Sequence, residues 1–287
     1  MSTTGPGADP TPGDGPGSGS GDGPGSGSGD GSAGGPGLLV EVADGAATVT
    51  ISNPARRNVL TPAMWRSLPG LLDELAADPA VRAVVLTGAG DGFSAGADIT
   101  GFTGPGGLRA AQEAAVAAED ALAAFPKPTL AAIRGWCVGG GCQLAVACDL
   151  RFAAQDARFA ITPAKLGIVY PASSTRRLVE LTGPSTAKHL LFSAETIDAE
   201  RALRTGLVDE VLPRDGLDKR VREFTGVLAS RSRLTQAAAK EFITATPDAI
   251  QVAHWSRQAA AGGDTAEGVA AFLERRDPRF TWSPAAD

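Results

Sequence analysis

The amino-acid sequence predicts an α/β fold. Apolar segments of strand length alternate along the chain with longer segments of helical character, and beyond Pro171 the pattern becomes mostly helical. Some strand-length segments, such as residues 82–88 (RAVVLTG), contain a continuous apolar run, which is typical of strands covered on both faces. We therefore expect a sheet with helices packed on it, followed by a helical C-terminal part.

The first predicted elements are a β-hairpin and a helix. Residues 38–42 (LLVEV) and 47–52 (ATVTIS) flank an Asp-Gly dipeptide, which favours a tight hairpin turn. Thr61 followed by Pro62 is a typical helix start, with threonine as the cap and proline at the first helical position. The amphipathic pattern predicts that this helix continues to about Ala77.

Further strands and helices follow in alternation. Residues 106–124 form an Ala-rich helical segment, and residues 129–133 (TLAAI) and 149–154 (DLRFAA) have the length and composition of strands. Between those two strands, residues 135–147 (GWCVGGGCQLAVA) indicate a loop followed by a helix. Residues 207–212 (LVDEVL) are the exception in the otherwise helical C-terminal part.

Residues 1–37 differ sharply from the rest of the chain. They hold 15 of the 37 glycines, six of the 20 prolines and four aspartates but no lysine or arginine, and they contain GDGPGSGS twice in tandem. Without these four aspartates, the whole-chain charge of −6 falls to −2 for the remaining residues. This composition buries too little apolar surface to offset the entropy of ordering. We expect a disordered leader with no part in the chemistry.

Charge and hydropathy exclude several classes of function. The nearly neutral body carries scattered Lys and Arg residues and offers no basic stripe for a nucleic acid. No apolar run approaches the roughly 18 residues of a membrane helix, and the first ten residues lack the basic and apolar regions of a secretory signal. Cys137, Cys142 and Cys148 match no zinc or CxxC spacing, so we expect buried free thiols in a reducing cytoplasm and no metal site.

Two glycine-rich turns stand where a strand leads into a helix. The turn at 88–98 (GAGDGFSAGAD) loosely resembles a dinucleotide-binding loop, but it follows a hairpin rather than a first βα unit, so a nucleotide-dependent oxidoreductase is only an alternative. In the second turn, Gly139, Gly140 and Gly141 open an apolar helix and allow a ligand to approach the backbone closely. Tight helix packing would explain one such turn, whereas two of them indicate a pair of backbone donors that could stabilise an enolate oxygen.

Several motifs resemble those of the crotonase (enoyl-CoA hydratase/isomerase) superfamily. The resemblance rests on NVLTPAMW at 58–65, FSAGADI at 93–99, the long motif at 126–154, GLVDEVLP at 206–213 and FLERRDPRF at 272–280. It covers residues 38 to about 280 and implies a spiral of repeated ββα units with a C-terminal helical region used in trimerisation. The implied divisions are a leader at 1–37, a ββα core at 38–231 and a helical region at 232–287. The resemblance also implies an acyl-CoA substrate, with no cofactor other than its coenzyme A. It implies that the chain associates with further copies of itself, as a homotrimer or a dimer of trimers.

The same resemblance assigns residues to the site. It implies that the backbone amides of Ala97 and Gly140 form the oxyanion hole. It also implies that Arg56 and Arg57 and the turn from Ala95 to Ile99 line the channel for coenzyme A. Within that turn and at the second glycine turn, the candidate binding residues are Ala95, Gly96, Ala97, Asp98, Ile99, Gly139 and Gly140.

Two positions depart from the hydratase pattern. The family's hydratases use two glutamates to handle water, and this chain has Gln143 and Pro163 at the matching positions. Glutamine does not exchange a proton in the useful range, and proline has no functional group. The resemblance therefore leaves conventional hydration or isomerisation, by other acid/base groups, as an alternative, together with a non-catalytic acyl-CoA-binding protein.

A third motif favours a different reaction. TPAKLGIVYP at 162–171 resembles the TPxxLGxxY motif of methylmalonyl-CoA decarboxylase, and its tyrosine falls on Tyr170. Decarboxylation needs no base, because departing CO₂ leaves its electron pair behind, but it needs an enolate cradle and a proton donor. A phenol with a pKa of about 10 can donate that proton. The sequence therefore predicts a decarboxylase-like or otherwise divergent acyl-CoA enzyme, with Ala97, Gly140, Tyr170 and Gln143 as the candidate catalytic residues.

Other acidic and hydroxyl groups have simpler explanations. Glu113, Glu119 and Asp120 lie on the predicted helix after the first turn, and we expect them to form a solvated face. Residues 173–175 (SST) replace glycines that are usual in the family, which predicts a more polar and tighter wall of the pocket.

Overall fold

The centre of the protein is a six-stranded mixed sheet with the strand order β1-β2-β3-β4-β6-β9. A computed structural model describes residues 35–102, 105–244 and 246–283, so almost all of the predicted leader at 1–37 lies outside the described residues. The strands of this sheet are β1 (Gly37–Ala43), β2 (Ala46–Ser52), β3 (Ala83–Gly88), β4 (Thr129–Ile133), β6 (Leu150–Ala154) and β9 (Glu210–Leu212). The predicted α/β class is confirmed.

The first two strands form the predicted hairpin. β1 and β2 are antiparallel, with Ala43 paired to Ala46 across a two-residue turn. The turn residues Asp44 and Gly45 have φ angles of 51° and 80°, as a turn with two left-handed residues requires. Every later neighbour in the six-stranded sheet, from β3 to β9, pairs in parallel.

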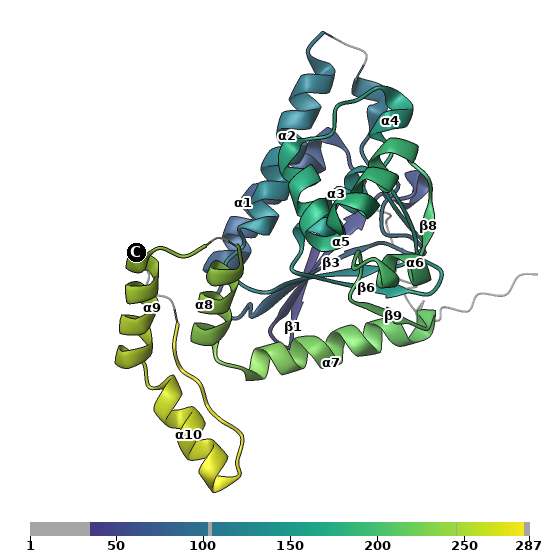
Figure 1. The fold of residues 1–287 in the computed structure, drawn as a ribbon. Coiled ribbons are helices and arrows are strands. Elements are labelled where there is room, and N and C mark those ends of the chain that lie inside the picture. The colour runs from purple at the N-terminus through teal and green to yellow at the C-terminus, as the bar shows by residue number, and fades with distance from the viewer. Residues whose placement is uncertain (1–34, 103–104, 245, 284–287) are drawn as a thin grey trace, which may run out of the picture. The chain divides into compact units, whose positions relative to one another are not determined.

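Helices cover both faces of the sheet, as the continuous apolar strands predict. In β3, Val84 and Leu86 face one core with α1 (Pro62–Ala77), α2 (Gly107–Ala123) and α3 (Gly140–Ala147). Val85 faces the opposite core, where Leu217 and Val221 of α7 (Leu217–Ser230) pack. Figure 1 shows α7 running across the sheet on the side away from the other three helices. This alternation gives the sheet a core on each face. The first glycine turn leaves the sheet at the carboxyl end of β3.

The predicted start of α1 is confirmed. Thr61 caps the helix, its hydroxyl accepting a hydrogen bond from the Met64 amide at 3.3 Å, and Pro62 occupies the first helical position. The cap places Met64 and Trp65 in the core with the first turn of the helix. Trp65 thereby becomes part of the wall beneath the glycine turns.

A second sheet, which the sequence pattern did not predict, joins the two glycine turns. It has the order β5-β7-β8, formed by β5 (Trp136–Val138), β7 (Arg158–Ala160) and β8 (Ile197–Asp198). Strands of two or three residues are too short to show an alternating pattern. An isolated bridge between Ser94 and Cys137 connects the first glycine turn to β5.

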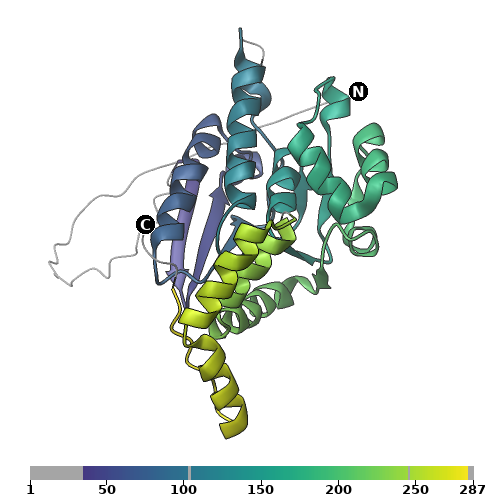
Figure 2. The same ribbon diagram turned by 60° about the vertical axis from the view of Figure 1, so that its left-hand side comes forward.

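The rest of the chain is mostly helical, as predicted. The remaining α-helices are α4 (Pro163–Leu166), α5 (Ala172–Ser193), α6 (Ala199–Arg204), α8 (Arg233–Thr244), α9 (Ala249–Ala261) and α10 (Asp264–Glu274). Figure 2 shows α9 and α10 (yellow) following one another beside the sheet. No helix among the described residues is both long and apolar enough to cross a membrane. The predicted division at residues 231/232 falls between α7 and α8.

Candidate active site

A cavity of about 360 Å³ lies where the two glycine turns meet. Its walls come from the segment before α1, the first glycine turn, α2, the start of α3 and the segment that leads into α5. Most of the predicted site residues line it: Arg56, Ala95, Gly96, Ala97, Ile99, Gly139, Gly140, Gln143 and Tyr170. Pro163, which replaces one of the family's glutamates, also lines it. Arg57 and Asp98 do not line it. The structure therefore brings together residues that are more than 100 positions apart in the sequence.

Glycine is required where the two turns touch. Gly96 has a φ of 109° and Gly139 a φ of 53°, both in the region that disfavours side chains. A Cβ atom on Gly96 would lie 3.0 Å from the Val138 carbonyl oxygen, and one on Gly141 would lie 2.8 Å from the Cβ atom of Ser94. The close approach of the two backbones depends on these residues having no side chain.

Two residues that line the cavity, Ala97 and Gly140, have backbone amides without a partner in the described part of the chain. The Leu60 amide donates to the Gly96 carbonyl oxygen at 2.8 Å, and the Asp98 amide donates to the Leu60 carbonyl oxygen at 2.9 Å, so the intervening Ala97 amide faces away from this ladder. Gly140 is the first residue of α3, where helical amides have no internal acceptor. Neither the Ala97 nor the Gly140 amide has a hydrogen-bond acceptor within the described part of the chain.

The two amides are neighbours. A Cβ atom on Gly140 would lie 3.2 Å from the Ala97 nitrogen and 2.8 Å from the Cζ2 atom of Trp65. Trp65 is 3% exposed and cannot move away without disturbing the core. The arrangement can hold one oxygen atom that carries negative charge, next to the positive end of the α3 dipole.

Glu119 corrects one of the sequence expectations. We expected it on a solvated face of α2 with Glu113 and Asp120, but its exposure is 0%. Its carboxylate accepts hydrogen bonds from the Gln143 amide nitrogen at 2.7 Å, from Nη1 of Arg177 at 2.7 Å and from the Ser174 hydroxyl. Burial of this charge is possible because these three donors surround it.

The helical spacing carried a signal that would have identified Glu119. It lies four residues after Ala115 and three before Leu122, which are both buried, so the three share one face of α2. Glu113 and Asp120 have side-chain exposures of 64% and 51%, in agreement with the expectation for them. Ser174, one of the predicted polar wall residues, is buried at the same place.

Tyr170 lines the cavity and is half-buried. Burial raises the pKa of its phenol well above the ordinary value, and the neighbouring Cys142 and Glu119 groups raise it further, while the Ser174 hydroxyl opposes the rise. The phenol is therefore neutral at physiological pH and is able to donate a hydrogen bond. Pro163, at the start of α4, contributes only an apolar surface to the same cavity.

The two arginines before α1 have different places. Arg56 forms a bidentate ion pair with Asp98, with distances of 2.6 and 3.1 Å, at the rim of the cavity. Hydrogen bonds from Arg56 and Thr100 lower the pKa of Asp98 to about 2. Arg57 has a φ of 53°, and its carbonyl oxygen accepts a hydrogen bond from the Ala95 amide at 2.9 Å. Arg57 thus holds the first glycine turn through its backbone.

The three cysteines are free and buried, as predicted. Burial raises the pKa of Cys148 to about 12 and that of Cys137 well above its ordinary value. Thiols held in the protonated form are poor nucleophiles. We assign them to packing around α3 and β5.

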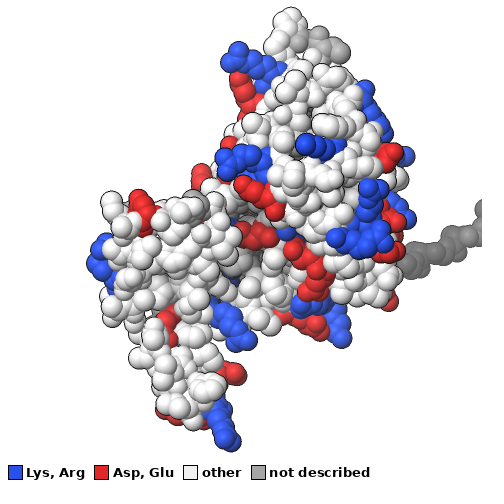
Figure 3. Space-filling model, in the orientation of Figure 1, with Lys and Arg blue, Asp and Glu red and all other residues white. Residues whose placement is uncertain are grey.

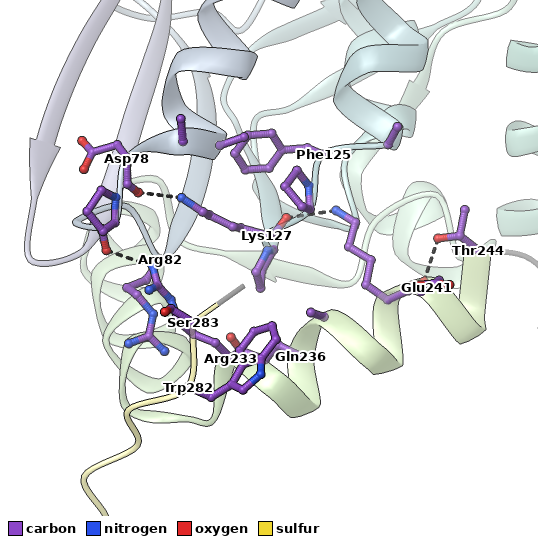
Figure 4. A pocket seen from close by; sticks show the side chains of 18 of the residues that line it. Asp78, Arg82, Phe125, Lys127, Arg233, Gln236, Glu241, Thr244, Trp282 and Ser283 are labelled. Atoms are coloured by element: carbon purple, nitrogen blue, oxygen red, sulfur yellow. Dashed lines mark hydrogen bonds between the residues drawn. The ribbon is translucent and has the colours of Figure 1, made fainter. Parts of the chain in front are cut away.

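A second cavity of about 570 Å³ lies between the core and α8. Figure 4 shows Lys127, Arg82 and Arg233 beside Trp282 in this cavity. Lys127 donates to the carbonyl oxygens of Leu75 and Asp78 at 2.8 and 2.7 Å, and Arg233 donates to those of Pro79 and Val81 at 2.9 and 3.0 Å. Arg233 therefore joins the start of α8 to the segment after α1, and Lys127 joins the segment before β4 to the end of α1. Arg82 donates through Nη2 to the Arg231 carbonyl oxygen at 2.9 Å, and its Nε has no partner among the described residues.

The surface charge agrees with the near-neutral composition of the body. On the face in Figure 3, the Lys and Arg side chains are interspersed with Asp and Glu side chains and form no continuous stripe. Several Lys and Arg side chains of the described residues are paired with an acidic side chain on the same helix, such as Arg204 with Glu200 at 2.7 Å. This face offers no nucleic-acid surface.

The chain matches a known protein family over most of its length. Residues 41–283 match the family model described as enoyl-CoA hydratase/isomerase. The chain is 34% identical to the crotonyl-CoA hydratase of Syntrophomonas wolfei, over 85% of this chain and 97% of that protein. It is 32% identical to the 2,3-dehydroadipyl-CoA hydratase of Escherichia coli, over 85% of this chain and 98% of that protein.

Solved structures of similar fold and similar sequence identity are also known. The crystal structure of an enoyl-CoA hydratase from Bacillus anthracis superimposes with a TM-score of 0.78 at 31% sequence identity. The match covers 85% of this chain and 98% of that one. The crotonase-type fold predicted from the motifs is thereby confirmed.

Proposed function

This chain belongs to the enoyl-CoA hydratase/isomerase family, and on that premise we propose that it binds an acyl-CoA in the 360 Å³ cavity and stabilises an enolate of the thioester there. The observation that carries the proposal is the pair of unpartnered amides at Ala97 and Gly140. A thioester oxygen between them would accept two hydrogen bonds that strengthen as its negative charge develops. No cofactor other than the coenzyme A of the substrate enters the proposal.

The reaction that fits these side chains best is decarboxylation. The bond from Cα to the carboxylate breaks, CO₂ departs, and the electron pair moves through Cα to the thioester oxygen to form the enolate. Tyr170 then gives its phenolic proton to Cα, and solvent returns a proton to the phenolate. The raised pKa keeps Tyr170 protonated until the much more basic enolate forms.

Hydration is the second candidate, because the relatives named above are hydratases. It requires a group to activate water and a group to deliver a proton. The positions expected to do so hold Gln143 and Pro163, and Glu119 is enclosed behind Gln143 and 0% exposed. These side chains support hydration less well than decarboxylation.

Coenzyme A and self-association complete the proposal. Arg56 lies at the rim of the cavity, where a guanidinium can meet a phosphate of coenzyme A.

The large apolar side chains of the C-terminal helices are exposed in one chain, including Ile243 at 85%, Ile250 at 76% and Phe272 at 82%. Surfaces of this kind favour burial against further copies, in a homotrimer or a dimer of trimers. The buried free thiols suit a cytoplasmic protein.

A panel of thioesters distinguishes the candidate reactions. Purified full-length protein is incubated with malonyl-, methylmalonyl-, crotonyl- and 3-hydroxybutyryl-CoA, and the masses of the products are measured by mass spectrometry. Loss of the mass of CO₂ from a malonyl-type thioester, strongly reduced in Tyr170→Phe, is the expected result. Rapid hydration of crotonyl-CoA that is unaffected by Tyr170→Phe would overturn decarboxylation. Binding without turnover of any thioester would indicate a non-catalytic acyl-CoA-binding protein.

A further inference from the structure

Glu119 occupies an unusual position for a carboxylate that does not face the substrate. It is fully buried in α2, directly behind Gln143, whose side chain lines the cavity. Its Oε1 atom is paired with Nη1 of Arg177 at 2.7 Å, and its Oε2 atom accepts from both Gln143 and Ser174. Both oxygens are therefore occupied, and the charge is compensated by Arg177.

The contact with Glu119 decides which end of the Gln143 amide faces the cavity. An ionised carboxylate only accepts hydrogen bonds, so it requires the NH₂ group of Gln143 on its side. The distance of 2.7 Å between Nε2 and Oε2 fits such a charge-assisted bond. The Oε1 atom of Gln143 is then directed to the other side of the amide. It has no donor among the described residues, yet it is not enclosed.

We propose, on the basis of the acyl-CoA site proposed above, that Glu119 is a positioning residue that presents the Gln143 oxygen to the acyl group. The cavity then has a fixed hydrogen-bond acceptor opposite the substrate. It favours acyl groups with a hydroxyl or another donor at that point. A substrate carboxylate is repelled by the oxygen and is directed toward the Tyr170 phenol, which can donate to it.

The alternative role for Glu119 is structural. It joins α2 to α3 through Gln143 and to α5 through Ser174 and Arg177, so its removal will lower stability in any case. A structural role predicts that all ligands bind less well in the same proportion. The positioning role predicts a change in discrimination between ligands that do and do not carry a donor, which is the readout that separates the two roles.

The test compares the dissociation constants of three thioesters that have no carboxylate to lose as CO₂, in the full-length protein. Butyryl-CoA, 2-hydroxybutyryl-CoA and 3-hydroxybutyryl-CoA are titrated by calorimetry. We expect the wild type to bind the better hydroxylated thioester about 3- to 10-fold more tightly than butyryl-CoA, the range of one buried hydrogen bond. In Glu119→Gln, whose amide can also donate, Gln143 is free to turn, and this ratio is expected to fall below about 2-fold.

Matched variants complete the experiment. Glu113→Gln makes the same chemical change on the exposed side of α2 and is expected to keep the wild-type ratio. Gln143→Leu removes the acceptor and is expected to lose the ratio, and Glu119→Gln should then have no further effect on the ratio in the Gln143→Leu background. Thermal melting reports the folded state of each variant.

Each outcome bears on one claim. A folded E119Q that keeps the ratio, or a wild type without any preference for a hydroxylated thioester, overturns the positioning role while leaving the acyl-CoA site in place. Failure of the wild type to bind all three thioesters overturns the proposed function itself. Should E119Q not fold, the ratio in Q143L decides, since a folded Q143L with the wild-type preference overturns the proposal.

Discussion

Two cavities of this protein differ in the hydrogen-bond partners of their polar groups. In the cavity beside α8, which is about 570 Å³, Lys127, Arg233 and Lys240 donate to backbone carbonyls or to Asp149. In the 360 Å³ cavity at the glycine turns, the amides of Ala97 and Gly140 have no acceptor among the described residues. The larger cavity carries more charge, and these three cationic groups are engaged, although Nε of Arg82 has no partner among the described residues.

The difference shows which property marks a site. Burying a rigidly held hydrogen-bonding group without a partner costs free energy. Such groups are therefore expected at sites where a ligand supplies the partner. A charge that is satisfied by backbone carbonyls instead contributes to stability. We therefore expect changes at the glycine turns to affect catalysis, and changes in the cavity beside α8 to affect folding.

The largest effect is expected for Gly140→Ala. The added Cβ atom would lie 3.2 Å from the Ala97 nitrogen and 2.8 Å from the Trp65 ring, which pushes the two amides apart. Loss of one such donor typically lowers kcat by about 10²- to 10³-fold. The variant is assayed with whichever thioester the wild type converts.

Gly70→Ala is the matched control for that substitution. Gly70 lies in α1, and its added Cβ atom would meet no atom within 4 Å. Wild-type activity and stability raised by roughly 0.5–1 kcal/mol are expected, because alanine favours the helix. A folded G140A with wild-type activity would show that the amides at the glycine turns are not needed for catalysis, which would contradict the distinction drawn between the two cavities.

The next effect is expected on stability, from Lys127→Met. Lys127 donates to two carbonyl oxygens at the end of α1, and methionine would leave both without that donor. We expect the free energy of unfolding in urea to fall by about 1–3 kcal/mol, with unchanged affinity for butyryl-CoA. A loss of thioester affinity in folded K127M would instead place the cavity beside α8 in the binding site.

The pH dependence of stability gives a smaller effect of known sign. Burial, together with Arg233, lowers the pKa of Lys127 from 10.5 to about 8, so between these pH values the folded state binds fewer protons than the unfolded state. The unfolding free energy of the wild type should therefore rise relative to K127M as the pH increases from 8 to 10.5. A difference between the two proteins that is flat or falls over this range would show that Lys127 is not desolvated.

The smallest effect is expected for Arg56→Ala at the rim. The side chain of Arg56 is 49% exposed, while that of its partner Asp98 is 12% exposed, and stability at neutral pH should fall by about 1 kcal/mol or less because solvent screens the Arg56 end of the pair. The dissociation constant for butyryl-CoA should rise by about 2- to 5-fold at low salt and by less at high salt. Titrations at two salt concentrations check this, and equal affinity in both proteins would exclude Arg56 from the phosphate contact.

The sequence was sufficient for elements whose signal is local. The hairpin depends on its Asp-Gly turn, and α1 depends on the Thr61 cap, so neighbouring residues were enough to predict both. The two glycine-rich turns predicted a pair of backbone donors, and the resemblance to known motifs assigned these donors to Ala97 and Gly140. No local pattern relates Gly96 to Gly140, because their contact is made by the topology of the sheets.

Glu119 and the second sheet show what the sequence did not reveal. The partners of Glu119 lie on α3 and α5, at Gln143, Ser174 and Arg177, and only the packed structure shows that they enclose the carboxylate. The strands β5, β7 and β8 have at most three residues, so pairing rather than periodicity defines them. In both cases long-range contacts decide the structure.

The thioester carbonyl itself provides the most direct test of the central claim. Butyryl-CoA labelled with ¹³C at the carbonyl is bound to the full-length protein, and isotope-edited infrared spectroscopy records the carbonyl stretch. If the amides of Ala97 and Gly140 hold the oxygen, the band shifts to lower frequency than in water, and the shift is lost in G140A but kept in G70A. A bound thioester whose band is unshifted in the wild type would contradict the account.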